Sequence, residues 1–136
     1  MERNKFAFIM RGVPGSGKSS TAFYLAGADG VIHAVDNYHT NESGVFHWDE
    51  KNADLFYEKN LKAFEDSCRR GYTVVVCDCI NVERKEYQKY IDIAKECGYI
   101  TSTVVMDKPD SSVAADRNKH FVTEGQIEDM YSRWED

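Results

Sequence analysis

The sequence predicts an α/β fold, a three-layer αβα sandwich with a mainly parallel sheet of four or five strands. Two observations support this prediction. Short apolar runs alternate with amphipathic stretches along the chain, and the first run ends in a glycine-rich loop. Such alternation is typical of βαβ units with right-handed crossovers, which give parallel sheets covered on both faces. The 136 residues, 42% of them hydrophobic, fit one domain over residues 1–136.

Four apolar segments are predicted to be strands. Residues 6–10 stop at the glycine-rich turn, and residues 31–35 stop before Asp36. Residues 73–78 are the strongest candidate because they are β-branched and continuous, and residues 101–106 form the last strand. In sheets of this kind, ligands bind at the carboxyl ends of the strands.

Helices are predicted between and after these strands. They run from Lys18 to Gly27, from 49 to 70, from the N-cap Asn81 to Gly98, from 111 to 119 and from 123 to 134. The second has apolar residues at three- and four-residue intervals, and the last opens with capping-box spacing. Residues 37–48 are polar and are predicted to form an irregular loop.

The charge of the chain limits its partners. A net charge of −6 and an isoelectric point near 5.2 argue against nucleic-acid binding on a broad basic surface. A local basic cleft that holds the end of one strand is compatible with this charge. The longest apolar run, residues 74–77, is far shorter than the roughly 20 residues that span a bilayer, so no membrane partner is predicted.

The four cysteines are Cys68, Cys77, Cys79 and Cys97, and none are spaced as CxxC. Cys77 and Cys79 would point to one face of a strand, whereas Cys68 and Cys97 lie near predicted helix ends. We therefore expect reduced, structural thiols in a cytoplasmic protein, with a metal site as the less favoured alternative.

Residues 12–19, Gly-Val-Pro-Gly-Ser-Gly-Lys-Ser, satisfy the phosphate-loop pattern GxxxxGK[ST] at every fixed position. The motif follows a predicted strand and opens a predicted helix, as it requires. Its glycines let backbone N–H groups point at phosphate oxygens, and the helix N-terminus adds partial positive charge. The alternative, a plain glycine-rich turn, gives no reason for the Lys-Ser pair. The fold prediction is therefore a P-loop NTPase-type sandwich that binds ATP or GTP with Mg²⁺.

The motif also predicts the nucleotide-binding residues. Lys18 is expected to contact the β- and γ-phosphates and to act in catalysis, and the Ser19 hydroxyl is expected to hold Mg²⁺. The other predicted nucleotide-binding residues of the loop are Gly12, Pro14, Gly15, Ser16, Gly17 and Ser20.

Two predicted strands end at an aspartate, Asp36 and Asp78. If both strands neighbour the first strand, both carboxylates lie beside the phosphate loop. A kinase needs one carboxylate to accept the proton of the acceptor hydroxyl and another group near the metal. We assign Asp36 to the first role and Asp78 to the second, with a turn-capping aspartate as the alternative for each.

Four segments, RGVPGSGKSS at 11–20, VDNY at 35–38, VCDCIN at 76–81 and DRNKH at 116–120, occur in a characteristic order and spacing. In this arrangement the chain resembles the polynucleotide-kinase-like P-loop kinases, which include bacteriophage 5′-hydroxyl polynucleotide kinase. The resemblance covers nearly the whole chain. Relatives often carry this unit fused to a phosphatase, ligase or phosphodiesterase, so fusion or partner domains occur in relatives.

The resemblance implies roles for individual residues. Asp36 matches the general base of the family, and residues 78–81 match its segment after the third strand. Arg117 begins a lid over the triphosphate, where an arginine can neutralise charge on the transferred phosphoryl group. Arg117 is thus a candidate for nucleotide binding and catalysis, with a solvated helix charge as the alternative. His120 is a candidate nucleotide ligand, with an ordinary surface histidine as the alternative.

Three departures from the family concern the acceptor side. The phage enzyme has an arginine three residues after its catalytic aspartate, where this chain has His39, a weaker phosphate ligand that we expect to be an ordinary surface histidine. The second lid arginine is missing, with Phe121 near its place, and Cys79 replaces a threonine. The resemblance therefore supports the roles of residues on the triphosphate side of the site more strongly than those on the acceptor side.

Residues 40–48 are predicted to cover the acceptor. Trp48 could stack on a base, an interaction worth about 1–3 kcal/mol, although packing against the following helix is the favoured interpretation. Tyr38 has the same two alternatives.

Three functions are compatible with these residues. The predicted one is transfer of the γ-phosphoryl of ATP or GTP to a 5′-hydroxyl of RNA or DNA, with Asp36 as general base. The second, which fits the acidic charge better, is a kinase for a small hydroxylated molecule. The third is a regulatory module that binds or slowly hydrolyses the nucleotide. The presence of Lys18, Ser19 and Asp36 together argues against the third.

Overall fold

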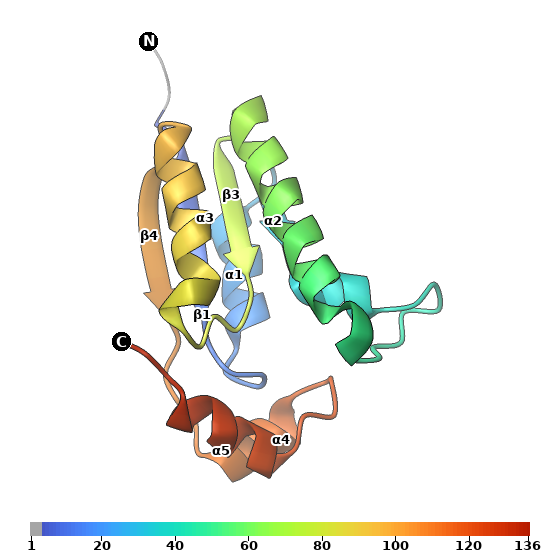
Figure 1. The fold of residues 1–136 in the computed structure, drawn as a ribbon. Helices are drawn as coiled ribbons and strands as arrows, with labels where there is room; N and C mark the ends of the chain where they lie inside the picture. The colour runs from blue at the N-terminus through green and yellow to red at the C-terminus, as the bar shows by residue number, and fades with distance from the viewer. Residues whose placement is uncertain (1–3) are drawn as a thin grey trace.

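The computed structural model describes residues 4–136 and has the α/β sandwich architecture that the sequence predicts (Figure 1). The strands are β1 (Phe6–Arg11), β2 (Val31–His33), β3 (Val74–Asp78) and β4 (Ile100–Val105). They form one sheet in the order β2-β3-β1-β4, and all three neighbouring pairs within the described residues are parallel. The predicted fold class is therefore confirmed, with four strands.

Five α-helices and two short 3₁₀ helices complete the described chain. They are α1 (Lys18–Ala26), η1 (Val35–His39), η2 (Glu50–Asn52), α2 (Ala53–Arg70), α3 (Arg84–Glu96), α4 (Ser111–Arg117) and α5 (Glu124–Ser132). Helices α2 and α3 lie in front of the sheet and α1 lies behind it (Figure 1). Helices α4 and α5 lie beyond the carboxyl ends of the strands, so they stand over the edge where ligands bind in such folds.

The two faces of β1 account for the two layers of the core. Successive residues of a strand point to opposite faces. Ala7 and Ile9 are fully buried in the cluster that includes Phe64 of α2, whereas Met10 is buried with Ala22 of α1. Since both faces of this strand are apolar, both are covered by helices.

A third apolar cluster connects the phosphate loop to the C-terminal helices. Val13 of the loop, Ala114 of α4 and Ile127 of α5 are buried together. The loop therefore contacts α4 and α5 directly, and these helices form one wall of the region around it.

The predicted strand over residues 31–35 is too long, because β2 ends at His33. Its ladder pairs His33 with Cys77, one residue before β3 ends at Asp78, so little of β3 remains to pair with later residues. The chain turns into η1 instead. Furthermore, β2 neighbours β3 and not β1, so only Asp78 ends a strand directly beside β1.

The predicted N-cap at Asn81 is wrong. Helix α3 begins at Arg84, and its N-cap is Glu83, which forms a capping box with Glu86. Asn81 is buried with a φ of 55°, and its side-chain amide donates to the carbonyl of Met10 at 2.8 Å. Its side chain therefore connects the chain after β3 to β1 and is not available for the helix.

Two other helix starts follow local capping. The capping box at Thr123 and Gln126 is confirmed, with both side chains bonded to the opposite backbone N–H. The predicted helix over residues 49–70 is divided, because Asp49 caps the 3₁₀ helix η2 and α2 begins after it at Ala53.

Candidate active site

The phosphate loop connects β1 to α1 with two glycines in the left-handed region. Gly15 has a φ of 85°, and Gly17, the N-cap of α1, has a φ of 86°. A Cβ on Gly15 would lie 2.4 Å from the carbonyl oxygen of Ala114, so the loop backbone packs closely against α4. Helix α1 has no side-chain cap, so backbone N–H groups at its start remain available to an anion.

The loop also offers a hydroxyl group. Ser16 Oγ is buried and has no hydrogen-bond partner among residues 4–136. Buried polar atoms are normally paired, so an unpartnered one at a phosphate loop fits a ligand that brings acceptor oxygens. Together with the glycine backbone and the start of α1, this hydroxyl fits a bound triphosphate.

Asp78 joins the two side chains at the start of α1. Its carboxylate lies 2.6 Å from Lys18 Nζ through Oδ1 and accepts a hydrogen bond from Ser19 Oγ at 2.9 Å through Oδ2. Burial opposes the charge on Lys18, but the ion pair and hydrogen bond with Asp78 outweigh burial and raise the pKa of Lys18. Lys18 therefore stays protonated near neutral pH.

A cavity of about 350 Å³, which we call the loop cavity, lies over the phosphate loop. Its lining comes from the loop, from η1 and from the end of α4. The lining residues are Val13, Pro14, Gly15, Ser16, Gly17, Lys18, Ser19, Ser20, Asp36, Arg117, Asn118, Lys119 and His120. Two predicted site residues do not line it. Gly12 donates its N–H to the Ile80 carbonyl, and Asp78 is buried behind Lys18.

Asp36 reaches this cavity by a route that the sequence does not show. It lies on η1, after β2, on a strand that is not adjacent to β1. The 3₁₀ helix η1 carries Asp36 to the loop cavity although β3 lies between β2 and β1. The condition that both aspartate-bearing strands neighbour β1 is therefore wrong, yet Asp36 lines the cavity beside Lys18.

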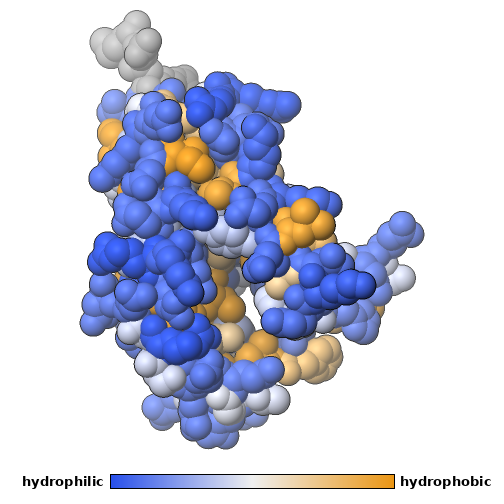
Figure 2. Space-filling view, in the orientation of Figure 1, coloured by the Kyte–Doolittle hydropathy of each residue, from blue (hydrophilic) through white to orange (hydrophobic). Residues whose placement is uncertain are grey.

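A second and larger cavity, about 1000 Å³, adjoins the first, and we call it the aromatic cavity. Phe46 and Trp48 of the 40–48 loop line it together with Phe121 and residues of α5. Figure 2 shows the molecule hollowed beside the lobe that α4 and α5 form, with hydrophobic residues at the inner wall. Asp36, Pro14 and His120 line both cavities, so these residues mark the boundary between them.

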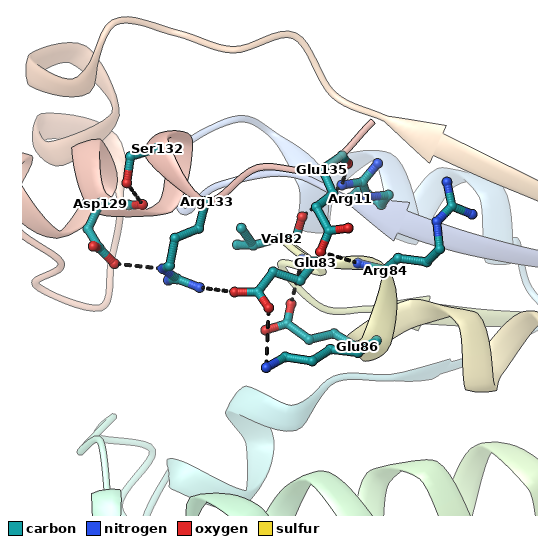
Figure 3. Close-up of polar contacts among 10 residues, drawn as sticks. Arg11, Val82, Glu83, Arg84, Glu86, Asp129, Ser132, Arg133 and Glu135 are labelled. Atoms are coloured by element: carbon teal, nitrogen blue, oxygen red, sulfur yellow. Dashed lines mark hydrogen bonds and ion pairs between the residues drawn. The ribbon is translucent and has the colours of Figure 1, made fainter.

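The charges around the aromatic cavity are mostly negative. Asp36, Glu50 and Asp129 line it, with Arg133 as the lining residue that carries a permanent positive charge. Arg133 donates to Asp129 and to Glu83 at 2.9 Å each, so both carboxylates already neutralise it (Figure 3). The cavity is thus an apolar and acidic environment.

His39 is not a surface histidine. It is 3% exposed, accepts the Asp49 N–H through Nδ1 at 3.0 Å and stacks on Trp48 with 4.2 Å between ring centroids. Burial lowers the pKa of His39, partly opposed by Asp36, Asp49 and Glu50. The interpretation that Trp48 packs against the following helix also needs correction. Its ring stacks on His39, and its Nε1 donates to Glu50. The buried His39 therefore packs against the 40–48 loop through Trp48.

Two other aromatic residues, Tyr38 and Phe46, stack on different partners. Tyr38 stacks on Phe56 of α2, which agrees with the structural interpretation of Tyr38. Phe46, which the sequence did not single out, stacks on His120 with 4.2 Å between centroids and 10° between ring planes. No periodic pattern marks Phe46, because it lies in an irregular loop and its partner is far away in the chain.

Residues 8–135 match the sequence profile of a family described as “AAA domain”. The chain belongs to the AAA domain family. The fold of this AAA domain is that of P-loop kinases, in agreement with the predicted relationship to the polynucleotide-kinase-like P-loop family.

Solved structures similar to the AAA domain include three relevant examples. A chain of the Pnkp1/Rnl/Hen1 RNA repair complex has a TM-score of 0.71 and 21% identity, covering 98% of this chain and 45% of that one. A gluconokinase from Sinorhizobium meliloti 1021 has a TM-score of 0.63 and 23% identity, covering 99% and 78%. The Mycobacterium tuberculosis APS kinase, in complex with AMPPNP and APS, has a TM-score of 0.59 and 18% identity, covering 86% and 69%.

These similarities concern the fold, and in the RNA repair complex the AAA domain spans less than half of the chain that it matches. Within residues 4–136, no helix is both long and apolar enough to cross a membrane. The same residues contain no group of three or more His, Cys, Asp or Glu side chains arranged to hold a metal ion.

Proposed function

We propose that this AAA domain is a phosphotransferase that moves the γ-phosphoryl group of ATP or GTP to a hydroxyl group bound in the aromatic cavity. The single observation that carries the proposal is that Asp36 lines both cavities. A carboxylate between the phosphate loop and a second ligand is where a general base must act. A protein that only bound a nucleotide would not need the second cavity.

In the proposed reaction, Asp36 accepts the proton of the acceptor hydroxyl while the hydroxyl oxygen forms a bond to the γ-phosphorus. The bond between the γ-phosphorus and the β–γ bridging oxygen breaks, and its electron pair stays on the leaving diphosphate. Lys18, Arg117 and the backbone N–H groups of the loop offset the negative charge that develops. The remaining predicted loop residues would surround the triphosphate.

Mg²⁺ would be held by Ser19 and Asp78. Their hydroxyl and carboxylate oxygens lie 2.9 Å apart and are the hard oxygen donors that this ion prefers. When bound, Mg²⁺ neutralises charge on the phosphate oxygens. We also propose a cytoplasmic location, because four free cysteines are typical of a reducing compartment.

The first proposed acceptor is a 5′-hydroxyl of RNA or DNA. The aromatic residues of the second cavity support it, since base–aromatic stacking contributes about 1–3 kcal/mol per base. Similarity to a chain of an RNA repair complex is in line with this acceptor. The proposal predicts that the terminal nucleoside occupies the aromatic cavity and that the rest of the strand lies outside it.

A small hydroxylated molecule is the second candidate acceptor, and one observation favours it. Arg133 is already paired with Asp129 and Glu83, so the described lining of the aromatic cavity offers no unpaired permanent cation to a strand phosphate. An uncharged acceptor needs no such cation. The two candidates share the donor site and the base, and they differ in what surrounds the hydroxyl.

The test is transfer of labelled γ-phosphate from ATP or GTP, with Mg²⁺, to 5′-hydroxyl RNA and DNA oligonucleotides and to a panel of nucleosides and sugars. The Asp36→Asn variant should lose at least about 10²-fold in kcat while its nucleotide affinity stays near the wild-type value. Asp66→Asn, the same change at an exposed residue of α2, is the matched control and should keep full activity.

The outcomes separate the candidates. Label on oligonucleotides supports the polynucleotide acceptor, and label only on nucleosides or sugars supports the small molecule. If Asp36→Asn transfers phosphate as well as the wild type does, Asp36 is not the base. Nucleotide binding that Lys18→Ala weakens, without transfer to any acceptor, would instead indicate a regulatory nucleotide-binding module.

A further inference from the structure

His120 contacts Asp36 directly. Its Nδ1 lies 3.2 Å from Asp36 Oδ2, and about a third of each side chain is exposed. A carboxylate oxygen has no proton to donate, so this contact is attractive when His120 Nδ1 carries a proton. The Phe46 ring stacks nearly parallel on the same imidazole. Three separate parts of the chain therefore meet at one histidine.

The turn that presents His120 is fixed by Asn118. The Asn118 amide nitrogen donates to the carbonyls of Ala114, Ala115 and Val122 at 2.9–3.1 Å. Its amide oxygen accepts the N–H groups of His120 at 3.1 Å and Val122 at 2.9 Å. The amide nitrogen has two hydrogens, so two of the three carbonyls share one of them. These contacts define the backbone around His120, and Phe46 packs against the His120 ring.

The two oxygens of Asp36 differ in their surroundings. Oδ2 lies 3.2 Å from His120 Nδ1, whereas Oδ1 makes no ion pair or hydrogen bond in the part of the chain that the structure describes. A base needs one oxygen free for the proton and gains from a group that orients the other, as in catalytic triads. Both residues lie at the boundary of the two cavities.

We infer that His120 is a positioning residue for Asp36: its Nδ1–H holds Oδ2, so that Oδ1 faces the acceptor hydroxyl, and Phe46 keeps the imidazole in the required plane. The inference rests on the proposed function of Asp36. It differs from a nucleotide-ligand role for His120, which would act on triphosphate affinity and not on the carboxylate. It also connects the 40–48 loop to the base, because Phe46 belongs to that loop.

Two substitutions separate the polar contact with Asp36 from the ring contact with Phe46. His120→Asn keeps a donor near the position of Nδ1 and removes the ring, whereas His120→Phe keeps a ring against Phe46 and removes the donor. We expect His120→Phe to lose at least about tenfold in kcat, since small misplacements of catalytic groups cost that much or more. His120→Asn should retain most of kcat, and both variants should bind ATP as the wild type does. Equal kcat values in the two variants, or a loss of ATP affinity with unchanged kcat, would overturn the inference.

A second measurement does not depend on activity. Long-range ¹H–¹⁵N correlation spectra of the wild type, with the His120 signals assigned from the His120→Phe variant, report which ring nitrogen carries a proton. We expect a protonated Nδ1 at neutral pH, and a change in its ¹⁵N shift in Asp36→Ala. An unprotonated Nδ1 would contradict the inference. If the spectra agree but the wild type transfers phosphate to no acceptor, the proposed function fails while the His120–Asp36 contact stands.

Discussion

Lys18 and Asp78 form a buried ion pair, with 2.6 Å between Nζ and Oδ1 and with 8% and 7% of the two side chains exposed. The pair joins the first residue of α1 to the last residue of β3. Because Asp78 also accepts a hydrogen bond from the Ser19 hydroxyl, one carboxylate orients both side chains that follow the last glycine of the motif. The geometry of the loop therefore depends on the neighbouring strand.

Asp78→Asn should destabilise the fold by about 3–5 kcal/mol, because it leaves Lys18 as a buried charge without its partner. Chemical denaturation measures the change. The control is Asp66→Asn, whose ion pair with Lys62 is exposed and should contribute about 0–1 kcal/mol. The double variant Lys18→Met, Asp78→Asn should be more stable than Asp78→Asn alone. If it is not, an uncompensated charge is not the cause.

Gly15→Ala and Gly125→Ala should act in opposite directions. A Cβ on Gly15 would collide with the Ala114 carbonyl, at a φ of 85°. We expect lower stability and weaker nucleotide binding, since the loop must move. A Cβ on Gly125, in α5, meets no atom within 4 Å and should stabilise the fold by about 0.4–1 kcal/mol. Thermal unfolding and nucleotide titration of both variants test this, and a harmless Gly15→Ala would argue against the close packing of the loop.

Arg117→Ala should reduce kcat more than nucleotide affinity, if the proposed function holds. Arg117 lines the loop cavity at the end of α4 and makes no ion pair or hydrogen bond within residues 4–136. A positive charge that acts on the transferred phosphoryl group contributes about 10²–10³-fold to kcat. Steady-state kinetics and ATP titration separate the two effects, with Arg70→Ala on α2 as the control. A loss of affinity with normal kcat would make Arg117 a ground-state ligand.

The parts of the fold that sequence reasoning could predict are those with local causes. The turn from β1 into α1 follows from the loop motif, and the start of α5 follows from its Thr123 capping box. The start of α3 does not follow from Asn81, a good N-cap residue, because Asn81 donates its amide N–H to the Met10 carbonyl of β1. A long-range hydrogen bond of that kind has no signal in the neighbouring sequence.

The residues of the candidate site that could be predicted from the sequence are likewise those with local causes. The positions of Lys18 and Ser19 could be predicted, because the motif fixes the start of α1. Asp36 could be predicted as a polar residue after an apolar run, but its route to the cavity through η1 could not. The stack of Phe46 on His120 could not, since it joins two irregular segments about 70 residues apart in the chain. The burial of His39 likewise depends on Trp48 and Phe46 folding over it.

Stability should fall when the pH is lowered through the range below about 6.5. Burial lowers the pKa of His33 from its ordinary value of 6.5, and Nε2 lies 2.8 Å from Ser67 Oγ. In that range the unfolded chain binds more protons than the folded one, so the free energy of unfolding decreases as the pH falls. His39, whose pKa is also lowered, acts in the same direction.

His33→Gln tests this pH dependence, because Gln places a polar group near Nε2 and does not titrate. Denaturation midpoints at about pH 7.5 and 5.5 should differ less in the variant than in the wild type, with the His39 contribution remaining. The wild-type difference should persist unchanged in His47→Gln, which alters an exposed histidine. Equal pH effects in wild type and His33→Gln would rule out the assigned role of His33.

Arg11 should be the residue that attaches the C-terminal segment to the sheet. Arg11 is 3% exposed, and its guanidinium donates to the carbonyl of Asn81. It also donates to the carbonyls of Val82 and Glu135, residues that Figure 3 labels. It also lies 4.6 Å from the centroid of the Trp134 ring. A lysine cannot form this planar set of contacts, so Arg11→Lys is not a conservative change.

Arg11→Lys should therefore cost at least about 2 kcal/mol, because buried carbonyls lose their donors, whereas Arg70→Lys on the surface of α2 should change stability by less than about 0.5 kcal/mol. In a Trp48→Phe background, Trp134 emission should shift to longer wavelength as the segment loosens. Because α5 forms a wall of the aromatic cavity, the KM for the acceptor should rise while ATP affinity is kept. A stable variant with unchanged Trp134 emission would mean that the ion pair of Arg133 with Glu83 is sufficient to hold the segment.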